Sequence, residues 1–159
     1  MPDASTTPRR TALVTGASAG IGEAFAEHLA ARGFDLVLTA RRLEVLREVA
    51  EGIQRRHDVG CRVIPADLAD PEAPRRIFYE LARDEIEIDV LVNNAGYGLE
   101  KTLLTQDWRE VADFMQVMSV AWLHFMQLAM PSMIERGWGR DANIASLAAF
   151  APDSPGSLY

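Results

Sequence analysis

Three glycines, Gly16, Gly20 and Gly22, are the residues that most clearly indicate a binding site. They follow an apolar run (11–15) and lead into an apolar-periodic segment (21–31). This order predicts a strand, a tight turn and a helix. The turn lets an anion approach the free N–H groups and positive dipole end of the helix. We therefore expect a nucleotide pyrophosphate at the residues of this turn: Gly16, Ser18, Ala19, Gly20, Ile21 and Gly22.

The second candidate group follows the next apolar run, 34–39, and consists of Ala40, Arg41 and Arg42. A carboxylate at the end of a second strand would bind the ribose 2′-hydroxyl of NAD. A guanidinium would instead pair with the 2′-phosphate of NADP. The sequence thus favours NADP over NAD, with Arg41 as the main ligand. The alternative is that both arginines simply begin a solvated helix.

Further motifs follow in chain order, and together with the Gly-x-x-x-Gly-x-Gly spacing they resemble the short-chain dehydrogenase/reductase family. The resemblance covers nearly all of residues 11–159. The additional matching residues are Asp67 and Leu68 after the third strand, Asn93, Asn94, Ala95 and Gly96 after the fourth, and Ser146 and Tyr159, thirteen apart, after the fifth.

This resemblance implies an oxidoreductase that transfers hydride between a nicotinamide and a small carbonyl or alcohol substrate. It implies that Asp67 and Leu68 lie near the adenine and that 94–96 border the cofactor. Ser146 would hold the substrate oxygen and Tyr159 would act as the acid/base. The chain departs from the family where an asparagine supports a water relay, because Met118 stands there and a thioether donates no hydrogen bond. Ser119 is adjacent, but on a helix it points about 100° away.

A second departure concerns the lysine that the family places four residues after the tyrosine. The sequence ends at Tyr159, and its single lysine, Lys101, lies in a predicted loop. We therefore expect impaired catalysis from the 159-residue chain. The alternative is a non-catalytic nucleotide-binding relic or fragment of the same family. A methyltransferase on a similar sheet is disfavoured, because Ala40 and Arg41 stand where that chemistry uses an acid.

Alternating strands and helices predict an α/β fold, a Rossmann-like doubly wound parallel sheet of strand order 3-2-1-4-5. Its nucleotide would lie beside the carboxyl ends of strands one and four. We expect a loose tail over 1–8 and an incomplete domain over 9–159 that lacks the family's C-terminal strands and helices. Pro71 should begin the third helix, and Asp107 should cap the next helical region. Pro131 should kink the long helix that follows or break its hydrogen-bond ladder. The expected strands are 11–15, 34–39, 62–65, 88–92 and 143–146, and the clearest helices are 21–31, 43–56 and 114–135.

The composition bears on the partners, the compartment and the metal sites to be expected. A net charge of −7, from 23 acidic and 16 basic residues, argues against a nucleic-acid partner. The N-terminus resembles neither a signal peptide nor a membrane anchor. A single cysteine, Cys61, in a predicted strand favours a reduced, cytoplasmic setting and a core role. Three scattered histidines predict no metal site. The family is usually homo-oligomeric, although this chain would lack much of that interface.

Overall fold

A computed structural model describes residues 9–150 of the chain. Five parallel strands form one sheet in the order β3-β2-β1-β4-β5, which confirms the predicted fold class. The expected tail over 1–8 lies outside the described residues. The strands are β1 (Thr11–Thr15), β2 (Asp35–Thr39), β3 (Cys61–Val63), β4 (Val90–Asn93) and β5 (Arg140–Asn143). The helices are α1 (Gly20–Ala30), α2 (Leu43–Arg56), α3 (Ala73–Arg83), α4 (Trp108–Met115) and α5 (Ala121–Glu135), with a π-helical turn η1 (Gln116–Val120) and a 3-10 turn η2 (Leu147–Phe150).

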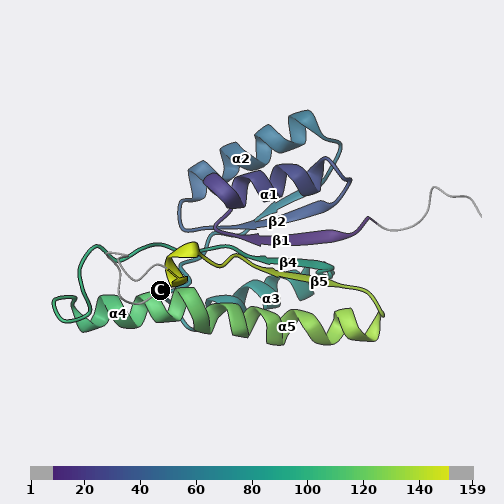
Figure 1. Cartoon of the computed structure of the whole chain (residues 1–159). Helices are drawn as coiled ribbons and strands as arrows, with labels where there is room; N and C mark the ends of the chain where they lie inside the picture. The colour runs from purple at the N-terminus through teal and green to yellow at the C-terminus, as the bar shows by residue number, and fades with distance from the viewer. Residues whose placement is uncertain (1–8, 151–159) are drawn as a thin grey trace, which may run out of the picture.

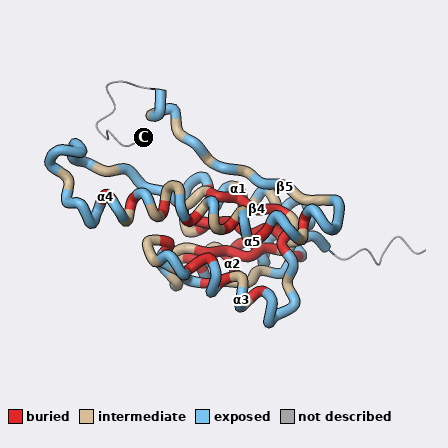
Figure 2. Tube along the Cα trace, turned by 90° about the horizontal axis from the view of Figure 1, so that it is seen from below, coloured by how far each residue is buried: buried red, intermediate tan, exposed pale blue. Residues whose placement is uncertain are grey.

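Helices cover both faces of the sheet, with α1 and α2 on one side and α3, α4 and α5 on the other (Figure 1). Successive strand residues point to opposite faces, so the central strands β1, β2 and β4 supply both cores. Leu13 and Leu91 pack with α3 and α5, whereas Val14 and Val92 pack with α1 and α2. The buried residues follow the central strands and the helix faces that cover them (Figure 2). This packing fixes the carboxyl ends of β1, β2 and β4 at one edge of the sheet.

Most elements begin within two residues of the predicted position, and the fifth strand begins three residues earlier than predicted. The fifth strand is Arg140–Asn143, not 143–146, and Asp141 lies within it. Its pairing with β4 places Asn143 beside Asn93. The strand is mostly exposed and polar, so an apolar pattern does not mark it. Helix α3 begins at Ala73 with a proline in its first turn, whereas the Asp70 side chain first closes a separate turn by accepting from the Glu72 N–H.

Helix α5 continues through Pro131 to Glu135, although proline has no N–H to donate to the helical hydrogen-bond ladder. Pro131 and Gln127 both lie on the exposed face, where water can bond the carbonyl that loses its donor. The departure from α geometry occurs earlier, at η1. Asp107 caps α4 as predicted, its carboxylate accepting a hydrogen bond from the Arg109 N–H at 2.8 Å.

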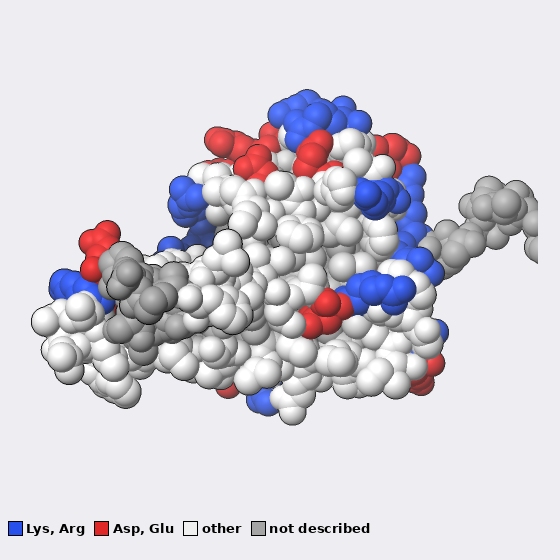
Figure 3. Space-filling model, in the orientation of Figure 1, with Lys and Arg blue, Asp and Glu red and all other residues white. Residues whose placement is uncertain are grey.

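This helical run, Trp108–Glu135, has the length and composition of a membrane span, with a mean hydropathy of 1.3 in its most apolar window. Core helices of soluble proteins have the same composition. Its buried positions include Phe125, Ala129 and Met133, which pack into the core beneath the sheet. On the face shown in Figure 3, charged side chains gather over α1 and α2, and the surface over α4 and α5 is largely uncharged.

Candidate cofactor site

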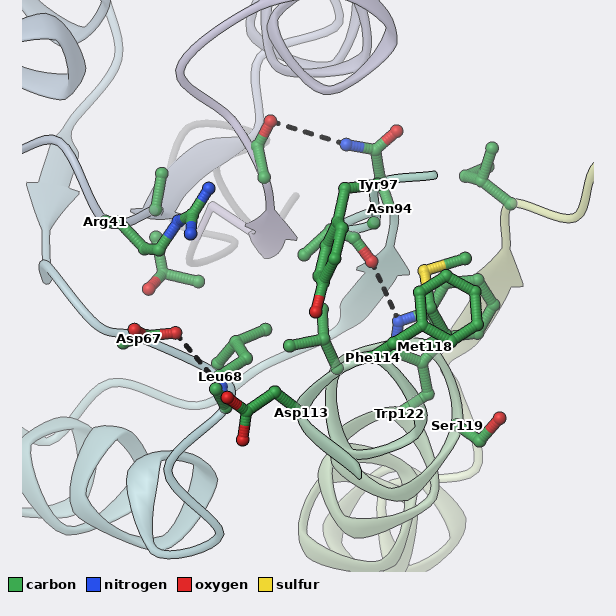
Figure 4. Close-up of a pocket in the computed structure, with 18 of the residues that line it drawn as sticks. Arg41, Asp67, Leu68, Asn94, Tyr97, Asp113, Phe114, Met118, Ser119 and Trp122 are labelled. Carbon is green, nitrogen blue, oxygen red and sulfur yellow. Dashed lines mark hydrogen bonds between the residues drawn. The ribbon is translucent and has the colours of Figure 1, made fainter. Parts of the chain in front are cut away.

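A cavity of about 860 Å³ lies at the carboxyl ends of the central strands, where the topology predicts a nucleotide (Figure 4). Its walls come from the turn after β1, the segments after β2, β3 and β4, the helical run at η1, and the segment after β5. Of the residues predicted to bind the cofactor, it is lined by Gly16, Ser18, Ala19, Ile21, Arg41, Arg42, Asp67, Leu68, Asn94, Ala95 and Gly96.

Gly20 and Gly22, the other two glycines of the turn, do not line this cavity. Gly20 has a φ of +60°, a conformation that favours glycine. Gly22 lies buried beneath the turn, where an added Cβ would meet the Gly16 carbonyl oxygen at 2.4 Å. Gly16, with a φ of +66°, approaches Ala95 so closely that a Cβ would lie 2.8 Å from its Cα. The glycines therefore shape the turn and its contact with the segment after β4.

The N-terminus of α1 opens from this turn and is suited to an anion. Its N-cap residue is Ala19, and no side chain caps the first N–H groups. Uncapped N–H groups at a helix start are donors for phosphate oxygens. The turn thus presents a small-residue cradle that fits a pyrophosphate.

Thr15 joins the glycine turn to the segment after β4, a role that the sequence did not reveal. Its side chain is fully buried. The Thr15 hydroxyl donates to the Val92 carbonyl at 3.2 Å and accepts from the Asn94 and Ala95 N–H groups at 2.9 and 3.0 Å. The Asn94 side-chain amide donates in return to the Thr15 carbonyl at 3.0 Å. These bonds position two of the predicted cofactor-binding segments relative to each other.

The segment after β2 carries the basic residues. Within residues 9–150 the exposed Arg41 guanidinium makes no ion pair with a carboxylate, and Ala40 precedes it. Arg42 donates to the Ser18 hydroxyl at 3.4 Å, which connects this segment with the glycine turn. Asp67, after the neighbouring strand β3, lies on the same side of the cavity (Figure 4), and its carboxylate accepts from the Ala69 N–H at 3.0 Å. An unpaired guanidinium at this edge is suited to a phosphate.

The opposite wall contains aromatic residues that sequence reasoning missed. Figure 4 shows Tyr97 between Arg41 and the side chains of Met118 and Trp122. The Tyr97 ring meets Phe114 edge to face, with centroids 5.5 Å apart. Burial raises the pKa of Tyr97, and nearby Asp113 acts in the same direction. The only sequence signal for Tyr97 was its position directly after Gly96.

Of the two predicted catalytic residues, Ser146 is among the described residues. Ser146 lines the cavity beyond the end of β5, half-buried, and its hydroxyl accepts from the Ala148 N–H at 3.1 Å. Tyr159 lies outside the described residues. Met118 and Ser119 both line the cavity, although Figure 4 shows the Ser119 hydroxyl on the side of the helix away from Tyr97.

Two further sequence predictions concern Cys61 and metals. Cys61 is half-buried at the start of β3, and burial raises the pKa of its thiol to about 11, which fits a packing role. Among residues 9–150 no group of three His, Cys, Asp or Glu side chains could hold a metal ion.

The sheet order and the cavity at its switch point define a Rossmann-like domain. Residues 10–159 match the profile of the short chain dehydrogenase family. The chain therefore belongs to this family, as its motifs predicted.

The similar proteins include reductases and a dehydrogenase. The chain is 34% identical over 144 residues to the 3-oxoacyl-[acyl-carrier-protein] reductase FabG of Aquifex aeolicus, covering 89% of this chain and 57% of the relative. It is 36% identical over 154 residues to the very-long-chain 3-oxoacyl-CoA reductase-B of Danio rerio, covering 93% and 48%. A short-chain dehydrogenase from Sphingobium yanoikuyae, solved in complex with NADPH, superposes with a TM-score of 0.87 at 32% identity, covering 94% and 58%. The chain thus spans about half the length of these relatives.

Proposed function

We propose that this chain supplies the cofactor-binding part of an NADP-dependent oxidoreductase that acts on a small carbonyl or alcohol. The observation that carries the proposal is the cavity, which joins the glycine turn, Arg41 and Ser146 in one space. When bound there, NADPH supplies the hydride for carbonyl reduction. The NADPH complex of the Sphingobium relative supports this choice of cofactor.

Each proposed role follows from the position of the residue. The uncapped start of α1 binds the pyrophosphate through backbone N–H groups. Arg41 binds the 2′-phosphate, because its charge has no carboxylate partner within residues 9–150 and Ala40 offers no acid to repel that phosphate. Asp67 borders the adenine end of the cavity. Asn94, Ala95 and Gly96 form the wall that Thr15 holds in place.

For the chemical step, Ser146 donates its hydroxyl proton in a hydrogen bond to the substrate oxygen, which stabilises negative charge developing there. Tyr159, in its proposed role, transfers a proton to that oxygen during reduction and accepts one during oxidation.

The cofactor choice is tested by titrating the purified chain with NADPH and NADH and following nicotinamide fluorescence. Arg41→Ala should weaken NADPH binding about 10- to 100-fold, the value of a charge-assisted hydrogen bond, and change NADH binding less than about 2-fold. The control is Arg55→Ala, because Arg55 is exposed on α2 and pairs with Glu51 away from the cavity. Equal loss for both cofactors would remove Arg41 from its proposed role.

A second candidate function, nucleotide binding without reduction, is favoured by Met118. Its thioether packs toward Gly96 in the cavity, so this position provides no hydrogen-bond donor for a proton relay. The two functions are separated by assaying the complete gene product for NADPH oxidation with a panel of aldehydes and ketones. Turnover supports the oxidoreductase, whereas NADPH binding without turnover across the panel supports the second candidate.

A further inference from the structure

Three side chains from the long helical run contact three consecutive residues of the segment after β4. The Phe114 ring packs against Tyr97 with centroids 5.5 Å apart. The Met118 sulfur lies over Gly96, 2.8 Å from the place of an added Cβ. The Trp122 indole N–H donates to the Ala95 carbonyl at 3.2 Å.

The π-helical turn η1 helps to keep these three side chains on one face of the helical run. They are four residues apart, and in an α-helix four residues overshoot a full turn by about 40°, so eight overshoot by about 80°. The wider turn of η1, Gln116–Val120, lies between the first and third of them and removes part of this overshoot. The row can therefore face one short loop along its whole length.

Of these contacts, the hydrogen bond from Trp122 restrains the backbone most directly. The Thr15 hydroxyl accepts a hydrogen bond from the Ala95 N–H, and the Trp122 indole N–H donates to the carbonyl of the same residue. The next residue is Gly96, which has no Cβ to limit its backbone rotation. Without the indole N–H, the Ala95 carbonyl would lose its hydrogen-bond partner among residues 9–150, and the peptide between Ala95 and Gly96 could rotate within the cavity wall.

We propose that Trp122 is a positioning residue for the cofactor, acting through the Ala95 carbonyl to hold the cavity wall in its binding conformation. This inference rests on the proposed function, because it assumes that NADPH lies against 94–96. Trp122 and Ala95 are both half-buried, so water can replace the lost hydrogen bond. The bond therefore contributes little to folding and more to the geometry of the wall.

The test compares Trp122→Phe, which keeps an aromatic ring and removes the N–H, with Trp108→Phe. Trp108 is 76% exposed at the start of α4 and does not line the cavity. Trp122→Phe should raise the NADPH dissociation constant about 3- to 10-fold, the range of one neutral hydrogen bond. Its urea unfolding midpoint should stay close to that of the unsubstituted chain. Trp108→Phe should change neither quantity.

A measurement on the unsubstituted chain provides a second readout that needs no folded variant. In proton NMR, the Trp122 indole N–H should exchange more slowly than that of Trp108, and only the former should shift on addition of NADPH. Equal exchange with no shift would overturn the proposal. So would unchanged NADPH affinity in Trp122→Phe, or an affinity loss matched by an equal loss of stability. If the unsubstituted chain binds no NADPH, the proposed function fails first; if it binds and Trp122→Phe binds equally well, only this inference fails.

Discussion

Replacing Thr15 with valine should destabilise the protein more than replacing it with serine. Valine has nearly the shape of threonine but removes the hydroxyl, which is fully buried and makes three hydrogen bonds. The Asn94 and Ala95 N–H groups and the Val92 carbonyl would each lose a partner. Serine keeps the hydroxyl and loses only a methyl group, so the pair separates the hydrogen bonds from the packing.

The size of the difference follows from the cost of unsatisfied polar groups. A buried donor or acceptor left without a partner costs about 1–3 kcal/mol. Asn94 and Ala95 are half-buried, so water can satisfy part of the deficit. We expect Thr15→Val to lower the free energy of unfolding by about 2–4 kcal/mol. Thr15→Ser should lower it by about 1 kcal/mol, the value of one buried methyl group.

Urea unfolding followed by far-UV circular dichroism measures both variants at pH 7, and NADPH titration measures the site. Thr15→Val should also weaken NADPH binding, because the hydroxyl joins the glycine turn to the segment after β4. A valine variant as stable as the serine variant would refute the reasoning, since it would mean that water satisfies all three backbone groups.

Two further predictions concern other contacts. Hydrogen bonding by Arg56 lowers the pKa of Glu27 from 4.5 to about 2, so the ionised carboxylate stabilises the fold above about pH 4.5 and this contribution is lost as the pH falls toward 2. Glu27→Gln should therefore lower the free energy of unfolding by up to about 1 kcal/mol at pH 7, a value limited by exposure of the carboxylate. In urea titrations this deficit should vanish near pH 2. A deficit independent of pH would contradict the prediction. Gly22→Ala should lower the free energy of unfolding in urea by about 1–3 kcal/mol, because its Cβ would meet the backbone at Gly16. Gly52→Ala should be neutral or stabilising, because its Cβ would meet only flexible arginine atoms at 3.4 Å or more. Equal effects of the two glycine substitutions would contradict the close approach.

Some of the site could be predicted because its residues carry local signals. Gly16 and Gly20 both adopt positive φ, and glycine is the residue that does so readily. The apolar run before them is a central strand, and central parallel strands are buried on both faces. Arg41 could be singled out because it lies two residues after the end of another such strand.

Other parts gave no local signal. Three of the four residues of β5 are polar, so only its pairing with β4 identifies it as a strand. Trp122 looked like one apolar residue among many in a long helix, and its hydrogen bond to Ala95 spans 27 positions in the sequence. The π-helical turn that helps to align it has no sequence pattern comparable to a helix cap.

By itself the sequence predicted the class of fold and the glycine turn, because hydrophobic periodicity and glycine conformation act over a few neighbouring residues. The strand order followed from the right-handed crossovers of a doubly wound sheet. The tertiary structure alone decided which groups meet. The bonds from Thr15 to Asn94 and from Trp122 to Ala95 join segments whose distance depends on how the sheet and helices pack. Contacts of this kind are properties of the packed chain, and no short stretch of sequence encodes them.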